Sequence, residues 1–310
     1  MGPLAVHLIA TVPVTTTPEE IAQWQAFKLE LGTHDLEAAL TKVTFSEALT
    51  RHVVSSSREF LIPKDIEVFE KLLHDRRVLP LSRLFRYFFV STHKDVHVIT
   101  PNYDRIAEYA ADASEFSHFT GFSYGYLNTR SRDSRTRIHQ NGEATRTVSI
   151  WKVHGSFDWF KNAAGQIVSL PSCRDTPADY MPVMITPGVE KYRLAYEEPF
   201  RTIMASSDNA LEKARSYFCV GFGFNDQHLQ TKLIERCEAA SLPIVVITME
   251  LSPAAKAFLT SGRCRKFLAL ERSPTGTRMF SHTDPTGTDI PGQDIWQLDK
   301  FLDMAIGADT

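Results

Sequence analysis

The feature that most constrains the fold is an alternation that begins near residue 93, in which short apolar segments alternate with segments of helical periodicity. Apolar runs of strand length lie at 96–100, 148–153, 183–185, 217–221 and 244–248. Helical patterns lie at 106–113, 198–205, 229–240, 253–260 and, as a last amphipathic helix, 296–305. Strands that are apolar along their whole length are typical of parallel sheets, which are buried on both faces. The alternation therefore predicts an α/β fold with a mainly parallel sheet and helices on both faces.

Residues 17–92 predict a helical module in front of this sheet. Thr17 can cap a helix, Pro18 suits its first position, and Glu20 completes a capping box. Apolar residues then recur at helical spacing, most regularly at Leu81, Leu84, Phe85, Phe88 and Phe89. We expect the aromatic residues of the module to form core rather than to stack on a ligand. Residues 4–12 predict a short strand.

Length and charge limit the class of protein. A chain of 310 residues with 43% hydrophobic residues suffices for one large domain, and we predict a single domain over 1–310 with the helical module at 17–92 and the α/β core at 93–310. The net charge of −3 favours neither nucleic acid nor a membrane as a partner. The apolar run at 4–14 is too short to span a bilayer. We therefore expect a cytoplasmic protein that does not bind a membrane or, directly, nucleic acid.

The cysteines do not predict a metal site. Four are present, and no two have the C-x-x-C spacing that is typical of structural zinc sites: Cys173, Cys219, Cys237 and Cys264. In a cytoplasmic protein we expect reduced thiols and no metal.

Three of the predicted strands end in polar or glycine-containing phrases. Residues 96–104 read Val-His-Val-Ile-Thr-Pro-Asn-Tyr-Asp, and residues 150–156 read Ile-Trp-Lys-Val-His-Gly-Ser. Residues 217–229 read Tyr-Phe-Cys-Val-Gly-Phe-Gly-Phe-Asn-Asp-Gln-His-Leu. In an open α/β sheet, ligands bind just beyond the carboxyl ends of the strands. The three phrases thus favour a Rossmann-like core with a nucleotide site.

Taken in this order, the phrases resemble the sirtuin-like domain of bacterial NAD-consuming proteins, many of which serve in anti-phage defence. The resemblance extends from about Val96 to Leu259. It implies that Asn102 and Asp104 hold the nicotinamide ribose and the carboxamide, and that His154 is the catalytic base. It also implies that the Gly-x-Gly-Phe-x-Asp loop at 221–226 contacts the adenosine half of NAD+.

These residue types suit the cleavage of the nicotinamide–ribose bond, which passes through an oxocarbenium-like ribose. Asn102 can orient the ribose hydroxyls or the attacking water, Asp104 can accept from the carboxamide, and His154 can take a proton near neutral pH. The candidate catalytic residues are thus Asn102, Asp104 and His154. The candidate NAD+-binding residues are Thr100, Tyr103, Gly155, Ser156, Gly221, Phe222, Gly223, Phe224, Asp226 and Glu250.

Each phrase also has a purely structural interpretation. Asn102 and Asp104 can form an Asx-turn that caps the helix beginning near Arg105. His154 can be a hydrogen-bonded histidine at a strand end, and the Gly-x-Gly phrase can be a tight strand–helix turn.

Two further segments bear on the resemblance. Ile185-Thr186-Pro187-Gly188, followed by Lys191-Tyr192, resembles the Pro-Gly segment that precedes the adenosine loop of sirtuins. Sirtuin-like domains also open with a strand and a glycine-rich loop that cradles the pyrophosphate, whereas here only Gly32 lies between Gly2 and Gly121. A β-branched loop holds a pyrophosphate less closely than glycines do.

Five arginines gather between residues 128 and 146, among serine, threonine and asparagine: Arg130, Arg132, Arg135, Arg137 and Arg146. They could bind phosphate or an acidic partner, or form a solvated excursion from the sheet. Asn141-Gly142 predicts a hairpin tip within this segment.

The resemblance implies an NAD+ hydrolase that depletes NAD+ in anti-phage defence by abortive infection. Such an enzyme needs gating, so we expect a separate sensor or regulatory protein subunit, or self-assembly, within an oligomeric complex. The alternative is a non-catalytic subunit that binds a nucleotide or holds a partner. A protein deacylase is disfavoured because the zinc ribbon of deacylating sirtuins is missing.

Overall fold

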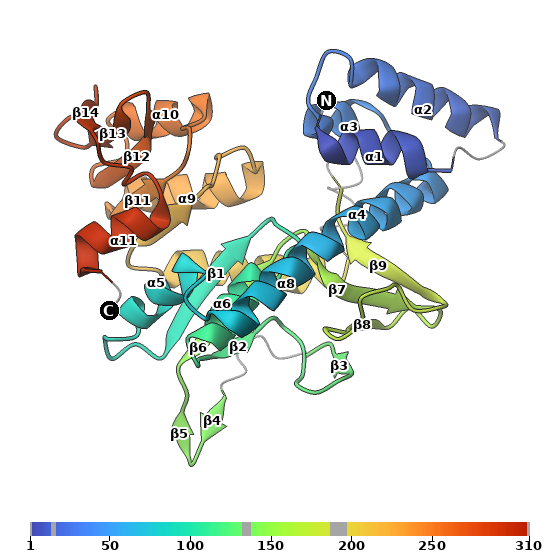
Figure 1. Ribbon diagram of the computed structural model, residues 1–310, viewed down its shortest axis with the longest axis horizontal. Coiled ribbons are helices and arrows are strands. Elements are labelled where there is room, and N and C mark those ends of the chain that lie inside the picture. Colours follow the sequence, from blue (N-terminus) through green and yellow to red (C-terminus); the bar gives the residue numbers. More distant parts are fainter. Residues whose placement is uncertain (1, 14–16, 132–137, 187–196, 309–310) are drawn as a thin grey trace. The chain divides into compact units, whose positions relative to one another are not determined.

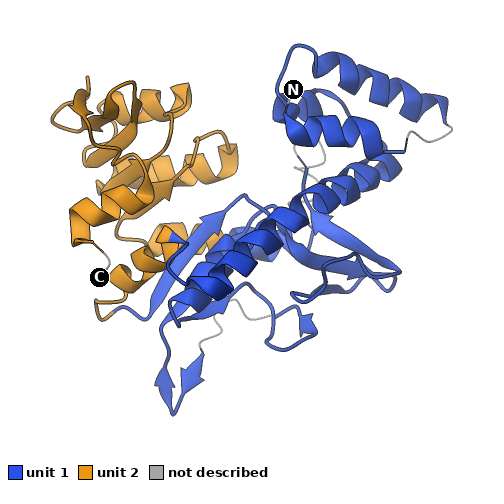
Figure 2. Ribbon diagram, in the orientation of Figure 1, with its two compact units in different colours: residues 1–79, 93–205 blue, residues 80–92, 206–310 orange. Residues whose placement is uncertain are grey.

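The computed structural model describes residues 2–13, 17–131, 138–186 and 197–308. They form two compact units, of which the first contains Met1–Leu79 and His93–Ala205 and the second contains Pro80–Thr92 and Ser206–Thr310 (Figure 2). The chain thus leaves the first unit for a short stretch and returns before the first strand. The single domain expected from the sequence stays a prediction.

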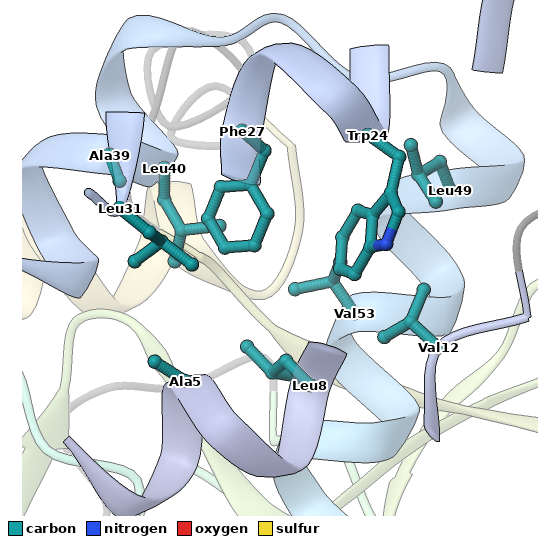
Figure 3. Close-up of a cluster of buried hydrophobic side chains, with 10 residues drawn as sticks. All are labelled: Ala5, Leu8, Val12, Trp24, Phe27, Leu31, Ala39, Leu40, Leu49 and Val53. Atoms are coloured by element: carbon teal, nitrogen blue, oxygen red, sulfur yellow. The ribbon is translucent and has the colours of Figure 1, made fainter. Parts of the chain in front are cut away.

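The first unit begins with helices α1 (Pro3–Thr11), α2 (Pro18–Glu30), α3 (Leu36–Lys42) and α4 (Glu47–His74) (Figure 1). The predicted strand at 4–12 was wrong, because these residues form α1. Ala5, Leu8 and Val12 recur at helical spacing and pack into the cluster around Trp24 and Phe27 (Figure 3). The prediction that these aromatic residues form core was confirmed, since both are almost fully buried.

Side-chain caps set the starts of the long helices. The Thr17 hydroxyl accepts from the backbone N–H of Glu20 at 3.4 Å, which confirms the predicted cap, and it donates to the Glu20 carboxylate at 2.8 Å, so this carboxylate binds the Thr17 side chain and not the backbone N–H of a full capping box. Ser46 caps α4 by accepting from the N–H of Leu49 at 3.1 Å. Helix α4 then continues through Pro63, which the sequence patterns did not predict.

A parallel sheet in the first unit has the strand order β1 (Asp95–Thr100), β6 (Thr147–Lys152) and β2 (Ser117–Phe119). Every residue of β6 is buried, as expected for a central strand covered on both faces. Helix α6 (Ile106–Ala113) follows β1, as predicted.

The first unit also contains antiparallel structure that the sequence patterns did not predict. One sheet has the order β3 (Asn128–Thr129), β8 (Ile167–Ser169), β7 (Gly155–Asn162) and β9 (Tyr180–Met184). The strand expected at 183–185 is therefore β9, and it pairs antiparallel with β7 instead of extending the parallel sheet. The predicted hairpin tip was confirmed: Asn141 and Gly142 have φ of 53° and 83° between β4 (His139–Gln140) and β5 (Glu143–Ala144).

The second unit is built on the sheet β10 (Tyr217–Val220), β11 (Ile244–Ile247), β12 (Phe267–Ser273), β13 (Gly276–Ser281) and β14 (Thr288–Pro291). The first three strands are parallel and the last two are added antiparallel. Its helices are α5 (Pro80–Phe88), α9 (Gln227–Ala240), α10 (Pro253–Thr260) and α11 (Leu298–Ile306). Helix α8 (Phe200–Lys213) is longer than the predicted 198–205 and begins among the residues of the first unit.

Both faces of this second parallel sheet are covered. On β11, Val245 and Ile247 join the apolar cluster that contains Leu84 of α5 and Phe301 of α11. The alternate residues Ile244 and Val246 of the opposite face are also buried. The predicted α/β class with a parallel sheet was confirmed, although the parallel strands are divided between two sheets. None of the described helices combines the length and apolar character that crossing a bilayer requires.

Candidate functional site

The first two phrases meet at one edge of the first unit's parallel sheet. Strands β1 and β6 run parallel with Thr100 opposite Lys152, so the residues that follow both strands leave the sheet at the same end. Backbone hydrogen bonds continue to join the two phrases beyond the ends of β1 and β6. Val153 N–H donates to Thr100 O and Phe157 N–H donates to Tyr103 O, both at 3.1 Å. The register therefore brings Asn102, Asp104 and His154 to the same sheet edge.

Two hydrogen bonds between side-chain oxygens and backbone N–H groups stabilise the turn that carries Asn102 and Asp104. The N–H of Asn102 donates to Thr100 Oγ1 at 3.1 Å, which engages the Thr100 hydroxyl within the turn. One oxygen of Asp104 accepts from the N–H of Ile106 at 3.1 Å, so Asp104 does form the predicted Asx-turn at the start of α6. Asn102 is exposed and Asp104 is half-buried. A capping role for one carboxylate oxygen is compatible with a second role for the other.

His154 follows β6 in a turn and is half-buried. Its carbonyl accepts from the N–H of Ile185 at 2.8 Å, which ties the turn to the chain after β9. Gly155 has a φ of +95°, and a Cβ there would meet the carbonyl oxygen of Val183 and lie 2.9 Å from Cα of Met184. The glycine is thus required by the close passage of β9, a structural reason that the sequence did not reveal.

Two predicted NAD+-binding side chains are instead used inside the protein. The Ser156 side chain is fully buried, and its hydroxyl donates to Asp158 Oδ1 and lies 3.4 Å from Tyr103 O. The Tyr103 hydroxyl donates to Ile185 O at 2.5 Å, and its ring packs near Phe157. Burial raises the pKa of Tyr103 far above its ordinary value, so the phenol stays protonated. The structure gives Ser156 and Tyr103 the role of supporting the turn.

Behind the turn lies a group of buried charges that the motifs did not predict. Asp65 of α4 accepts from the backbone N–H of Arg105 at 2.7 Å, from its Nε at 2.8 Å and from the Tyr109 hydroxyl at 2.7 Å. Arg105 also donates to Pro171 O at 2.7 Å. The ion pair therefore joins α4 to the backbone directly after Asp104.

A second buried ion pair joins β6 to α6. Nζ of Lys152 lies 3.3 Å from Oε1 of Glu108, and the Lys152 side chain has no exposed surface. Burial raises the pKa of Glu108, and the nearby Lys152 ammonium opposes that rise. One signal of this ion pair was visible in the sequence, because Lys152 is the one charged residue of the predicted strand 148–153. The partner Glu108 could not be predicted from the sequence, because its position in a helix is typical of any polar residue.

The third phrase lies in the second unit, at the carboxyl ends of β10 and β11. Gly221 has a φ of +62°, and its N–H donates to Ile247 O at 2.8 Å. Ser252, which caps α10, donates to Gly223 O at 2.5 Å. Glu250 is exposed, and its carbonyl accepts from the Thr248 hydroxyl at 3.1 Å. The loop after β10 and the loop after β11 are therefore brought together.

Two other residues of this phrase have structural roles. Asp226 is buried and caps α9 by accepting from the N–H of Leu229 at 3.2 Å. Phe224 is 1% exposed, and its ring lies 4.8 Å from that of Phe222 and 5.9 Å from that of Phe258. The Phe224 side chain is therefore part of an apolar cluster, and its contact with NAD+ stays a prediction. Phe222 and Gly223 are half-buried and Gly221 is exposed.

Some of the sequence predictions fall outside the described residues. Arg132, Arg135 and Arg137, and the Pro187-Gly188 and Lys191-Tyr192 pairs, are among them. Arg130 is described, and it donates to Gly121 O while its guanidinium lies 5.3 Å from the centre of the Phe122 ring. Arg130 is therefore bound within the first unit, and Arg146 is exposed.

A family model for the SIR2-like domain matches residues 96–257, just over half of the chain. The chain belongs to the SIR2-like family. The matched region begins in β1 and ends in α10, so it includes all three phrases. Membership indicates a function related to NAD in general and supports NAD+ as the ligand. No curated protein matches the chain.

Proposed function

We propose that this chain hydrolyses NAD+ to ADP-ribose and nicotinamide. The observation that carries the proposal is the parallel register of β1 and β6, which places Asn102, Asp104 and His154 at one sheet edge. Family membership supports NAD+ as the substrate. An amide, a carboxylate and an imidazole are the groups that this cleavage needs.

In the proposed reaction, the oxygen of water bonds to C1′ of the nicotinamide ribose as the C–N bond breaks. Nicotinamide leaves as a neutral molecule and keeps the electron pair of that bond. Asp104 accepts from the carboxamide through the oxygen that does not cap α6, and Asn102 orients the ribose or the water. His154 takes the proton that is released, and solvent finally receives it. The contact of the loop at 221–226 and of Glu250 with the adenosine half, which the resemblance implies, stays a prediction.

The substitution Asp104→Asn tests this assignment sharply. Asparagine caps helices about as well as aspartate, so the turn and α6 are expected to keep their stability. The acceptor charge is lost, and we expect nicotinamide release to fall by roughly 10²-fold, of the order seen when one positioned transition-state contact is removed. Nicotinamide release from NAD+ is followed by chromatography, with thermal unfolding as the stability control. Release at the wild-type rate would remove Asp104 from the mechanism.

We further propose that the hydrolase is a gated effector of anti-phage defence. An ungated enzyme would deplete the NAD+ of its own cell, so a separate regulatory subunit or self-assembly restrains it. If about 1% of the isolated chain is competent, a partner needs roughly 3 to 5 kcal/mol of differential binding to activate most of it. Turnover of the dilute monomer is compared with that of the chain plus the products of its neighbouring genes. Full activity of a verified monomer would contradict gating.

A non-catalytic nucleotide-binding or scaffolding subunit is the second candidate. The observation that favours it is α1. Sirtuin-like domains open with a strand and a pyrophosphate loop, whereas residues 3–11 form a helix that packs into an apolar cluster. NAD+ binding without nicotinamide release under any condition would support this role. A deacylase would be recognised by activity on acyl-lysine peptides.

A further inference from the structure

Lys152 is an unusual residue for the end of a central strand. It is the last residue of β6, a strand buried along its whole length, and its side chain has no exposed surface. The ammonium nitrogen donates to the carbonyl oxygen of Asp104, lies 3.4 Å from that of Tyr103 and is 3.3 Å from the carboxylate of Glu108. An ammonium has three N–H donors, and these three partners satisfy all of them.

Stability alone does not account for this buried pair. Removing two charges from water costs free energy that their attraction often fails to return, and well-packed apolar residues frequently do as well or better. The backbone groups that Lys152 binds, the carbonyls of Tyr103 and Asp104, suggest a different role. The two carbonyls belong to consecutive peptide units of the turn, and between them lies the Cα of Asp104.

We infer that Lys152 is a positioning residue of the proposed NAD+ site, with Glu108 as its counter-charge. By fixing the carbonyls of Tyr103 and Asp104, the ammonium fixes the backbone from which Asn102 and Asp104 project. This inference rests on the proposed hydrolase function. Geometry of this kind matters for rate, because a displacement of about 1 Å can cost on the order of 10²-fold.

Other groups also hold the turn, but among the described residues Lys152 alone has hydrogen bonds to both carbonyls. The N–H of Phe157 and the hydroxyl of Ser156 approach the Tyr103 carbonyl alone. Asp65 holds the N–H of Arg105 on the helical side of Asp104. Arginine is a poor substitute for Lys152, because its planar fork donates in fixed directions, whereas the ammonium donates from a single point.

The test is a charge-balanced double variant, Lys152→Met with Glu108→Leu, in the full-length chain. It removes the ammonium without leaving a lone buried carboxylate, so the fold is expected to survive. We expect kcat for nicotinamide release to fall by roughly 10²-fold while the unfolding midpoint stays near that of the wild type. The single variant Lys152→Met should lose both activity and stability. Recovery of stability without recovery of activity separates positioning from a merely structural role.

Arg58→Met is the matched control. Arg58 is also a buried cation of the first unit that donates to backbone carbonyls, those of Phe157 at 2.7 Å and Cys173 at 3.2 Å. Hydrogen–deuterium exchange is measured for peptides that cover 101–106. Exchange at 101–106 should become faster in the double variant and stay close to wild type in Arg58→Met, where the change should fall around residues 157 and 173.

The outcomes separate the two proposals. Wild-type kcat and wild-type exchange at 101–106 in the double variant would overturn the positioning role. A wild-type chain that releases no nicotinamide under any condition would instead defeat the hydrolase proposal. The exchange comparison still decides in that case whether Lys152 holds the turn, since it needs no turnover.

Discussion

The loops that follow β1 and β10 occupy equivalent places at the ends of parallel strands, yet they are held by different means. The loop at 101–105 in the first unit is fixed by buried charges, with Lys152 on one side and Asp65 on the other. The loop at 221–226 in the second unit is fixed by backbone and hydroxyl contacts, such as that of Ser252 with Gly223 O. The first loop is glycine-free, and the second contains Gly221 and Gly223.

This difference is what the proposed roles of the two loops, catalysis for the first and ligand contact for the second, lead us to expect. Catalytic groups must be held within narrow limits, and buried hydrogen-bonded ions on rigid elements do so. A loop that only contacts a ligand can rely on glycines, which let the backbone approach closely. The predictions that follow test whether the first loop is the more sensitive of the two.

The largest effect is expected for His154→Ala. Removing a general base typically costs about 10²–10⁴-fold in rate, and His154 is a half-buried residue of a turn, so its side chain contributes little to the core. The measurement is nicotinamide release together with thermal unfolding. His34→Ala serves as a control, because His34 is an exposed residue near Glu30 and Lys42. Equal turnover of the two variants would rule out His154 as the base.

Asp65→Ala should produce the largest loss of stability. It leaves the buried guanidinium of Arg105 without its carboxylate and removes the acceptor of the Tyr109 hydroxyl. Loss of one partner of a buried ion pair costs about 3–5 kcal/mol in the free energy of unfolding, measured by chemical denaturation.

Asp112→Ala is the surface counterpart. Its carboxylate lies 3.0 Å from Nδ1 of His118 and is 58% exposed, so the loss should stay below about 1 kcal/mol. Similar losses in both variants would mean that the buried pair does not fix the first loop.

Gly155→Ala should cost about 2–4 kcal/mol in the free energy of unfolding. The left-handed backbone contributes roughly 1–2 kcal/mol of this, and the clash of the new Cβ with the backbone of β9 contributes the rest. Chemical denaturation measures the loss. A cost below about 1 kcal/mol would show that β9 gives way easily and that this side of the site is not rigid.

Much of the fold could be predicted, because local signals agree with it. Helix α10 begins at Pro253 after the cap Ser252, and β6 contains the strand-forming apolar residues Val148, Ile150 and Trp151, so both could be predicted from local signals. The antiparallel strands could not be predicted in this way. Strands β7 and β9 pair although β8 lies between them along the chain, and their sequence patterns do not encode that pairing.

The residues proposed to contact NAD+ could be predicted from the sequence, whereas the buried residues that hold their turn in place could not. Asn102 and His154 follow apolar strands, and the parallel register that joins them follows from the fold class. Lys152 stands out in its strand, but the carbonyls that it holds and the partner Glu108 are known only from the structure. The burial of Phe224 could not be predicted, because a phenylalanine in a glycine-rich loop is typical of a ligand contact and of a core residue alike.

Gly221→Ala is expected to have a smaller effect than Gly155→Ala, and it completes the comparison of the two glycines. Gly221 has a φ of +62°, but a Cβ there meets nothing within 4 Å, so only the backbone conformation is penalised. We expect a loss of about 1–2 kcal/mol in the free energy of unfolding, measured by chemical denaturation. NAD+ affinity is measured alongside by calorimetry. If a ligand does approach this loop, affinity should fall by more than the strain explains, because the new methyl group lies in the space left for it. Unchanged affinity with the expected small loss of stability would reduce Gly221 to the tight strand–helix turn that its spacing also predicts.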